Sequence, residues 1–226
     1  MEQFFYTSST WIIPVLISIS MHEAAHGYAA NLLGDDTAKK LGRVTLNPFK
    51  HIDPFGTLLL PGLLLLVRAP FLFGFAKPVP VDFSKLRNPK RDMVWVALAG
   101  PISNILLAVF SALLIGVGTL VGGILGVWIV INLENSILIN LLLAVFNLIP
   151  LPPLDGGRVA VGLLPKPWNW RLARLERFGL FILLGLLFVA PMLMEKVGIV
   201  FDPFRWLVLI PVQSLFDLLK VVTGIP

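Results

Sequence analysis

The chain has 226 residues, of which 57% are hydrophobic and 14% are charged. A soluble domain of this size carries about a quarter charged residues, so the composition excludes an ordinary soluble domain and predicts a protein embedded in lipid. The net charge is +5. In a membrane protein such an excess is expected from Lys and Arg in cytoplasmic loops, so we expect no nucleic-acid partner. The absence of cysteine excludes disulfides, thiolate metal ligands and a cysteine nucleophile.

Five apolar runs are each near the ~20 residues that a helix needs to cross the hydrocarbon core of a bilayer. They fall at about 12–33, 93–121, 124–149, 178–194 and 204–219. A shorter run, 56–67, is below spanning length and is interrupted by Pro61 and Gly62. The pattern predicts an all-α, polytopic helical bundle in the cell membrane, formed by a single integral membrane domain over residues 1–226.

The basic residues distinguish two topologies. If the short run crossed the membrane, the chain would have six spans and its Lys and Arg would be divided between the two sides. If the run dips in and returns, every basic residue except Lys196 and Arg205 lies on one side, which the positive-inside rule favours. We therefore predict five spans and a re-entrant segment from about 56 to 76, with six spans as the alternative. The N-terminus is then outside and the C-terminus cytoplasmic.

The first apolar run contains a metal-binding pattern. His22 and His26 are four residues apart, so on a helix they share a face and can reach one ion. Glu23 lies beside them, where a carboxylate can accept a proton from water at the metal rather than bind the metal. Two histidines and a glutamate are costly inside a lipid-embedded helix unless they have a partner. The pattern therefore predicts a zinc site with Glu23 as general base, open to water from the cytoplasmic side.

A catalytic zinc commonly has three protein ligands, so a third ligand is needed. His51 and Asp155 are the leading candidates. Asp155 follows a stretch with three prolines, which stop the preceding helix, and precedes two glycines. Its side chain fits two roles equally well, as a metal ligand or as the cap of the next helix. His51 lies in a basic loop, where a histidine is more often a surface residue than a ligand, so we keep it off the predicted metal list.

Several motifs, taken together and in this order, resemble the site-2 protease family of intramembrane metalloproteases. Three carry the resemblance: residues 22–26, 100–104 and 147–157. Residues 47–54 and 74–81 are similar to the small bacterial and archaeal branch that lacks PDZ and CBS modules. The resemblance implies that His22, His26 and Asp155 bind one zinc ion and that Glu23 activates water. It also implies that Asn147 helps to stabilise the oxyanion and that the active site opens to the cytoplasm.

The segment 74–81 is expected to be extended and hairpin-like. Pro78 and Pro80 remove donors from one edge, so the amides of Lys77, Val79 and Val81 would face the other. An intramembrane protease must unwind its substrate helix, and a free strand edge could hold the unwound chain. We therefore consider this edge as a substrate-binding element.

The predicted activity is hydrolysis of peptide bonds in or near the transmembrane segment of a protein substrate. One alternative is a non-catalytic membrane protein, such as a zinc-binding chaperone or transport component, but a structural site has no need of Glu23 as a base. Another alternative is a prenyl-peptide type of membrane zinc protease. Its third ligand would be a glutamate on a later helix, and Glu134, Glu176 and Glu195 lack a comparable motif.

Overall fold

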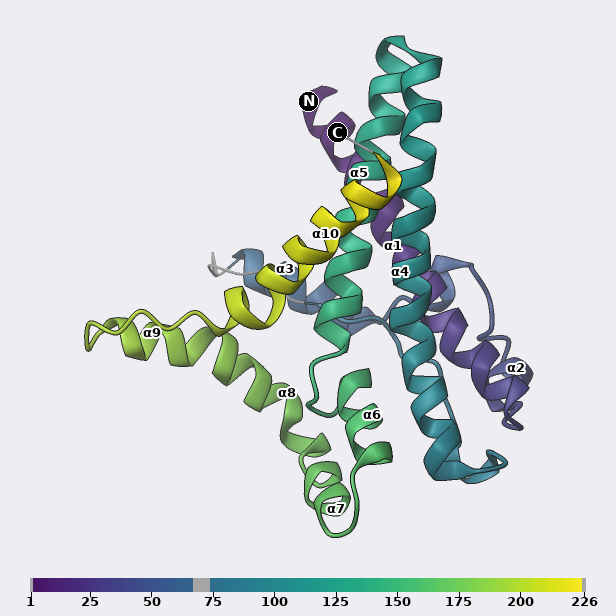
Figure 1. Cartoon of the computed structure of the whole chain (residues 1–226), viewed down its shortest axis with the longest axis vertical. Coiled ribbons are helices and arrows are strands. Elements are labelled where there is room, and N and C mark those ends of the chain that lie inside the picture. Colours follow the sequence, from purple (N-terminus) through teal and green to yellow (C-terminus); the bar gives the residue numbers. More distant parts are fainter. Residues whose placement is uncertain (1, 67–73, 225–226) are drawn as a thin grey trace.

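A computed structural model describes residues 2–66 and 74–224, and most of these residues are helical, with no β-strand among them (Figure 1). The predicted all-α class is thus confirmed. The α-helices are α1 (Glu2–Leu32), α2 (Thr37–Lys40), α3 (Leu60–Leu66), α4 (Pro89–Val121), α5 (Gly123–Asn147), α6 (Asp155–Leu163), α7 (Trp168–Ala173), α8 (Glu176–Leu184), α9 (Ala190–Glu195) and α10 (Ile210–Thr223). Shorter turns of 3-10 or π geometry are η1 (Pro48–Lys50), η2 (Pro54–Leu59), η3 (Phe83–Lys85), η4 (Gly185–Val189) and η5 (Arg205–Leu209).

Four helical stretches are long and apolar enough to cross a membrane: Pro89–Val121, Gly123–Asn147, Glu176–Glu195 and Arg205–Thr223. They coincide with four of the five apolar runs in the sequence. The remaining run, 12–33, coincides with the second part of α1 and extends one residue beyond its end at Leu32; this stretch also contains ionisable and hydroxyl side chains, which lower its hydropathy. The chain is therefore a membrane protein built as a helical bundle.

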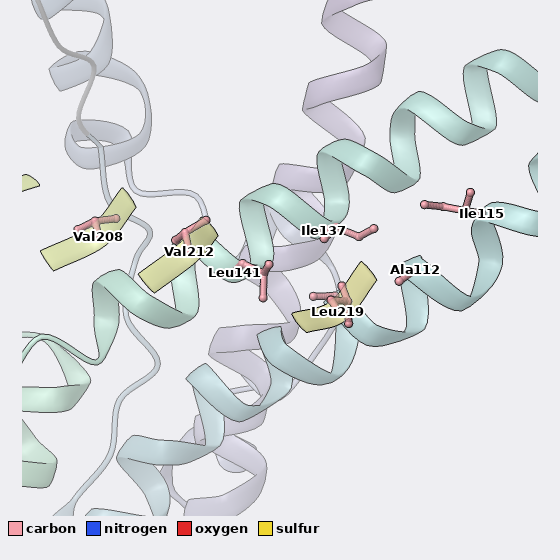
Figure 2. Close-up of a cluster of buried hydrophobic side chains, with 8 residues drawn as sticks. Ala112, Ile115, Ile137, Leu141, Val208, Val212 and Leu219 are labelled. Atoms are coloured by element: carbon pink, nitrogen blue, oxygen red, sulfur yellow. The ribbon is translucent and has the colours of Figure 1, made fainter. Parts of the chain in front are cut away.

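The centre of the bundle is the antiparallel pair α4 and α5, which α1 and α10 cross (Figure 1). The start of α4 is set by Pro89 at its first turn and by Asp92, whose carboxylate accepts a hydrogen bond from the Asn88 amide at 2.8 Å. The helix ends at Gly122, whose φ of 65° suits glycine. Small side chains of α4 let α10 approach the pair. The shared core comprises Ala108, Ala112, Ile115, Ile137, Leu141, Val208, Val212 and Leu219 (Figure 2).

A broken connection joins α5 to α6, as the three prolines predict. The α5 helix ends at Asn147, and α6 begins at Asp155. The later helix α8 packs against this connection through Gly179, because a Cβ atom added at Gly179 would lie only 1.5 Å from the carbonyl oxygen of Pro152. The close packing of a helix on the connection fixes the position from which α6 starts.

The predicted re-entrant segment, 56–76, begins as a helix. Asp53 caps η2 by accepting hydrogen bonds from the amides of Phe55 and Gly56, and the helix continues through α3 to Leu66. Residues 67–73, in the middle of the segment, lie outside the described residues, so the re-entrant course remains a prediction. From Gly74 the chain is irregular and forms no β ladder within the described range, so the expected hairpin-like pairing is absent there.

The irregular segment is fixed to the end of α1 near Asp35. The Asp35 carboxylate accepts hydrogen bonds from the amides of Thr37 and Asp82, at 3.0 and 2.7 Å. Burial alone raises the pKa of Asp35, but the hydrogen bonds from Thr37 and Asp82 outweigh it and hold this pKa below its usual range. Asp35 therefore joins two segments that lie far apart in the sequence.

The C-terminal helices do not run alongside α4 and α5, although a simple five-span bundle would require this. In Figure 1, α8 and α9 lead away from the α4–α5 pair, and α10 returns across it. The start of α1 and the end of α10 both lie toward the end of the pair where α4 joins α5, whereas the five-span prediction puts them on opposite faces of a bilayer. For the two ends to lie on opposite faces of a bilayer, α8–α10 would have to run alongside α4 and α5.

Replacing Gly179 with alanine should destabilise the protein strongly, because the new Cβ meets a backbone carbonyl that cannot move without shifting the connection. We expect a loss of about 2–3 kcal/mol, the upper range for overpacking, measured by thermal unfolding in detergent. Gly185→Ala is the matched control in the same helical stretch, since a Cβ there has no neighbour within 4 Å. That control should be neutral or slightly stabilising. Equal unfolding temperatures for the two variants would contradict the packing described.

Candidate metal centre

The α1 helix carries both histidines of the predicted metal motif. Because an α-helix has 3.6 residues per turn, His22 and His26 lie one turn apart on the same face. Their rings meet edge to face, with centroids 4.7 Å apart, and their Nε2 atoms are 3.1 Å apart. Both side chains are buried. They present two nitrogen atoms to one point inside the bundle.

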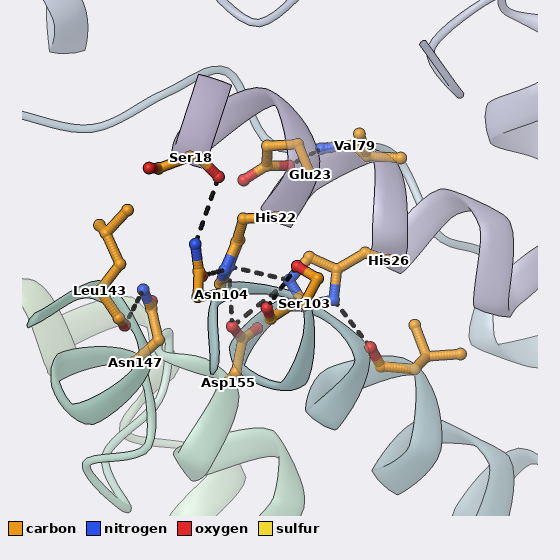
Figure 3. Close-up of polar contacts among 12 residues, drawn as sticks. Ser18, His22, Glu23, His26, Val79, Ser103, Asn104, Leu143, Asn147 and Asp155 are labelled. Atoms are coloured by element: carbon orange, nitrogen blue, oxygen red, sulfur yellow. Dashed lines mark hydrogen bonds and ion pairs between the residues drawn. The ribbon is translucent and has the colours of Figure 1, made fainter. Parts of the chain in front are cut away.

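Asp155 brings a third atom to this point from the first residue of α6 (Figure 3). Its Oδ2 lies 3.2 Å from His22 Nε2 and 3.3 Å from His26 Nε2. Among the residues that the structure describes, this is the one group of three or more His, Asp or Glu side chains close enough to share an ion. No side-chain hydrogen bond caps α6, so the structure gives Asp155 no capping role.

Hydrogen bonds on the far side of each ring fix where its proton lies. His26 Nδ1 is 2.7 Å from the carbonyl oxygen of Val96, which can only accept, so Nδ1 is the donor. His22 Nδ1 is 2.6 Å from Asn104 Oδ1, and the Asn104 amide nitrogen donates to two other oxygens, so here also Nδ1 is the donor. In the neutral rings both Nε2 atoms therefore carry a lone pair and no proton.

The converging atoms fit a zinc ion. Two lone pairs and a carboxylate oxygen are directed at one point, and Asp155 Oδ2 is buried with no hydrogen-bond partner. Such atoms repel one another unless a cation lies between them. Tetrahedral zinc with bonds of about 2.0–2.1 Å separates its ligand atoms by about 3.3–3.4 Å, close to the separations found here. Two imidazoles and one carboxylate are also a donor set of catalytic zinc sites.

The site depends on a close approach between α1 and α4. Three positions spaced by four residues on α1 face three positions with the same spacing on α4, which is the pattern of ridges packed into grooves. These positions are Ser18, His22 and His26 in α1 and Val96, Gly100 and Asn104 in α4. A Cβ added at Gly100 would lie 2.4 Å from His26 Nε2 and 2.6 Å from His22 Cε1. Glycine at this position leaves the space that the two rings occupy.

A buried chain of polar side chains holds Asn104 in turn. Asn104 Nδ2 donates to Asn140 Oδ1 at 2.7 Å, and Asn140 Nδ2 donates to Ser18 Oγ at 2.7 Å and to the Ser136 carbonyl at 2.8 Å. Ser111 and Ser136 continue the chain with a contact of 2.8 Å. Because each amide is fixed by several partners, the oxygen of Asn104 can only face His22. Asn140 thus joins α5 to α1 and α4 and also supports the position of His22 through Asn104.

Glu23 and Asn147 share a cavity with the converging atoms. The cavity has a volume of about 420 Å³, and its wall includes His22, Glu23, His26, Asn147 and Asp155. Glu23 Oε2 accepts a hydrogen bond from the Val79 amide at 2.7 Å. Asn147 Nδ2 donates to the Leu143 carbonyl at 2.9 Å, which uses one of its two N–H groups. The structure thus brings all five predicted site residues to one cavity.

His51 is not part of this group. Its ring is 2% exposed, and its Nε2 lies 2.8 Å from the Thr45 carbonyl oxygen. It borders a second, adjoining cavity rather than the one that contains Glu23. His51 therefore lies outside the group of converging atoms formed by His22, His26 and Asp155.

The predicted free edge of the segment 74–81 is not free. The Lys77 amide donates to the His51 carbonyl at 2.9 Å, and the Val79 amide donates to Glu23. Arg43 Nη2 binds the carbonyl oxygen of Lys77 from the other side, at 2.8 Å. The amides of Lys77 and Val79 thus face the half-buried Glu23 carboxylate and the His51 carbonyl, which accept their hydrogen bonds. The expectation that these two would await an unwound substrate was wrong.

Three groups that hold the histidine rings in place were not predicted from the sequence. Gly100 and Asn104 were noted only as parts of a motif, and the carbonyl of Val96 was not considered. Asn104 could have been found, because an amide inside a lipid-embedded helix requires a polar partner. A glycine that leaves space and a backbone carbonyl that accepts a proton carry no such signal, since both roles arise from the approach of another helix.

The comparisons with known proteins agree on one family. The profile of Peptidase family M50 matches residues 127–189. The chain is 41% identical over 185 residues to "Putative zinc metalloprotease YwhC" of Bacillus subtilis, covering 80% of each protein. It is 31% identical over 178 residues to "Putative zinc metalloprotease Rip2" of Mycobacterium tuberculosis, covering 79% of this chain and 66% of the relative.

The Rip2 relative of Mycolicibacterium smegmatis is 30% identical over 181 residues, with the same coverage of 79% and 66%. No solved structure matches the chain. An identity of 41% across four-fifths of a relative is sufficient to assign the family. The chain therefore belongs to peptidase family M50, the site-2 proteases, and is a zinc metalloprotease.

Proposed function

We propose that the protein hydrolyses peptide bonds in or near the transmembrane segments of protein substrates, and that His22, His26 and Asp155 hold its zinc ion. The observation that carries this proposal is the convergence of three unprotonated ligand atoms, separated by 3.1–3.3 Å, inside a bundle of apolar helices. A metal centre at this depth is best suited to a substrate that is itself embedded in lipid. A soluble peptide would reach such a site less readily.

Zinc held by His22, His26 and Asp155 would supply Lewis-acid chemistry, which lowers the pKa of water and polarises a carbonyl group. Glu23 accepts the proton from the attacking water and passes it to the leaving amine. The Val79 amide holds the Glu23 carboxylate in the cavity wall. Asn147 has a second N–H group that can donate to the oxygen on which negative charge develops. Because water attacks directly, no covalent intermediate with the protein forms.

The non-catalytic alternatives are not favoured. A structural zinc site closes its coordination with protein ligands, whereas the described residues bring three ligands together and place a carboxylate in the same cavity. The names of the relatives YwhC and Rip2 point to a protease rather than to a chaperone or transport component.

The other catalytic alternative, the prenyl-peptide type of protease, needs a glutamate as third ligand, whereas the group found here offers Asp155.

We propose further that the metal cavity opens to the cytoplasm, with the N-terminus outside and the C-terminus cytoplasmic. Basic residues precede α4 and follow α5, and in this antiparallel pair those two ends lie on the same side of the bundle (Figure 1). The positive-inside rule makes that side cytoplasmic. The charge pattern also puts Lys220, and hence the C-terminus, on the cytoplasmic side, and this part of the proposal requires α8–α10 to align with α4 and α5, which they do not do in Figure 1.

Replacing Glu23 with glutamine should abolish cleavage and leave zinc bound, because the amide keeps the shape of the side chain but cannot take a proton. We expect a loss of at least about 100-fold, as for the removal of a general base. The test combines zinc content by mass spectrometry with cleavage of single-span substrates in detergent or liposomes. Unchanged cleavage would sink the proposed mechanism.

Replacing Asp155 with alanine should lower zinc occupancy well below one ion per chain, because it leaves only two ligands. Asp36→Ala is the control, since Asp36 lies on the surface with its side chain 45% exposed and pairs with Lys40. The control should bind zinc as the unmodified protein does. Full occupancy in Asp155→Ala would return Asp155 to a structural role.

The proposed orientation can be tested with single cysteines, because the chain has none of its own. Lys39→Cys and Lys166→Cys should be protected from a membrane-impermeant thiol reagent in intact cells and should react after lysis. Lys196→Cys should react in intact cells. The reverse pattern would overturn the orientation and leave the metal site unaffected.

A further inference from the structure

A second cavity adjoins the metal cavity. Its volume is about 690 Å³, within the ~300–1,000 Å³ range of ligand pockets. It lies between α1, α5, the α8–η4 stretch and the segments around residues 48–57 and 74–76. Seven residues border both cavities: Ile19, Gly74, Phe75, Ala76, Leu143, Phe146 and Leu183. An extended chain that passes the metal centre can therefore continue directly into the second cavity.

The wall of the second cavity is apolar apart from three side chains: Ser20, His51 and Thr57. Thr57 is already satisfied, because its hydroxyl donates to the Phe75 carbonyl and accepts from the Asp53 amide. Ser20 Oγ and His51 Nδ1 are buried and have no hydrogen-bond partner. Buried polar atoms without partners are rare in native proteins and call for an explanation.

The two unpaired groups are chemically complementary to a peptide bond. The Thr45 carbonyl can only accept, so His51 Nε2 carries the proton and the Nδ1 of the neutral ring is an acceptor. The Ser20 hydroxyl can donate. An acceptor for N–H and a donor for C=O match the two polar groups of a main chain that has left its helix. Such groups are costly in an apolar cavity unless they find partners.

We propose that this second cavity binds the unwound, apolar stretch of the substrate next to the scissile bond, and that Ser20 and His51 position its main chain. The inference rests on the proposed function and adds the path of the substrate and two positioning residues. The occupant is an extended segment of apolar residues, because the wall is apolar and continuous with the metal cavity.

Binding can be tested without activity. In a Glu23→Gln background, Val15→Cys places a single thiol in the wall of the second cavity, and Ile17→Cys places one on the outer face of α1, where Ile17 is 49% exposed. A single-span peptide with one cysteine near the middle of its apolar segment is then oxidised with each variant. We expect a disulfide with Val15→Cys at least about fivefold more abundant than with Ile17→Cys. Equal yields would overturn the proposed path.

The positioning role has its own test. His51→Gln keeps a donor for Thr45 but removes the Nδ1 acceptor, and Ser20→Ala removes the donor. Each should raise KM for a single-span substrate about three- to tenfold at nearly constant kcat, as expected for the loss of one hydrogen bond used in binding. Ser20→Ala should also leave Tm equal or higher, because it removes an unsatisfied polar atom.

Thr10→Val is the matched control, since Thr10 is a buried hydroxyl of α1 that donates within the helix and borders neither cavity. Its KM should not change. Unaltered KM in both Ser20→Ala and His51→Gln would overturn the positioning role. If the unmodified protein cleaved no substrate, the proposed function would fail, whereas the Val15→Cys disulfide would still report whether the cavity binds the peptide.

Discussion

The rings of His22 and His26 are each oriented by a hydrogen bond at Nδ1, the nitrogen that faces away from Asp155, and much of the structure serves to hold this orientation. The Val96 carbonyl accepts a hydrogen bond from His26 Nδ1, and Asn104 Oδ1 accepts one from His22 Nδ1. Both Nε2 atoms therefore carry a lone pair and no proton. Together with the Asp155 carboxylate they make a point of negative potential inside an apolar bundle. A divalent cation is the natural complement to such a point, and the donor set selects zinc. Asn104 and the Val96 carbonyl would not touch the ion, yet they determine which ring nitrogens are free to bind it.

The α4 helix is the main support of this arrangement. It supplies the two acceptors that orient the rings and, between them, a glycine that leaves room for the rings. The amide of Asn104 is fixed by Asn140, so α5 contributes to the orientation of His22 without contacting it. Buried polar networks of this kind are stable when every member is satisfied. The network also explains why amides and serines occur in the middle of membrane helices.

The sequence predicted the class of fold and the five residues that line the metal cavity, because these features depend on local patterns. The histidines four apart, the broken helix before Asp155 and the long apolar runs can each be read within a few turns of chain. The prediction was less successful where a role depends on which segment lies opposite. Gly100 and Val96 act only because α1 packs on them, and the amides near Val79 face inward because Glu23 and His51 lie beneath them. Whether the ends of the chain lie on opposite sides likewise depends on how α8–α10 pack, which periodicity does not specify.

The position of Asp155 has a consequence beyond catalysis. Two proposed ligands lie on the first helix and the third lies far along the chain, on the helix that follows the broken connection. An ion held by all three would join two parts of the fold that lie far apart in the sequence, and unfolding would release it, because the unfolded chain does not hold the three ligands together. Zinc would then stabilise the folded protein by an amount that grows with the logarithm of its free concentration above the dissociation constant. The supply of metal would set the lifetime of the protein in the membrane as well as its activity.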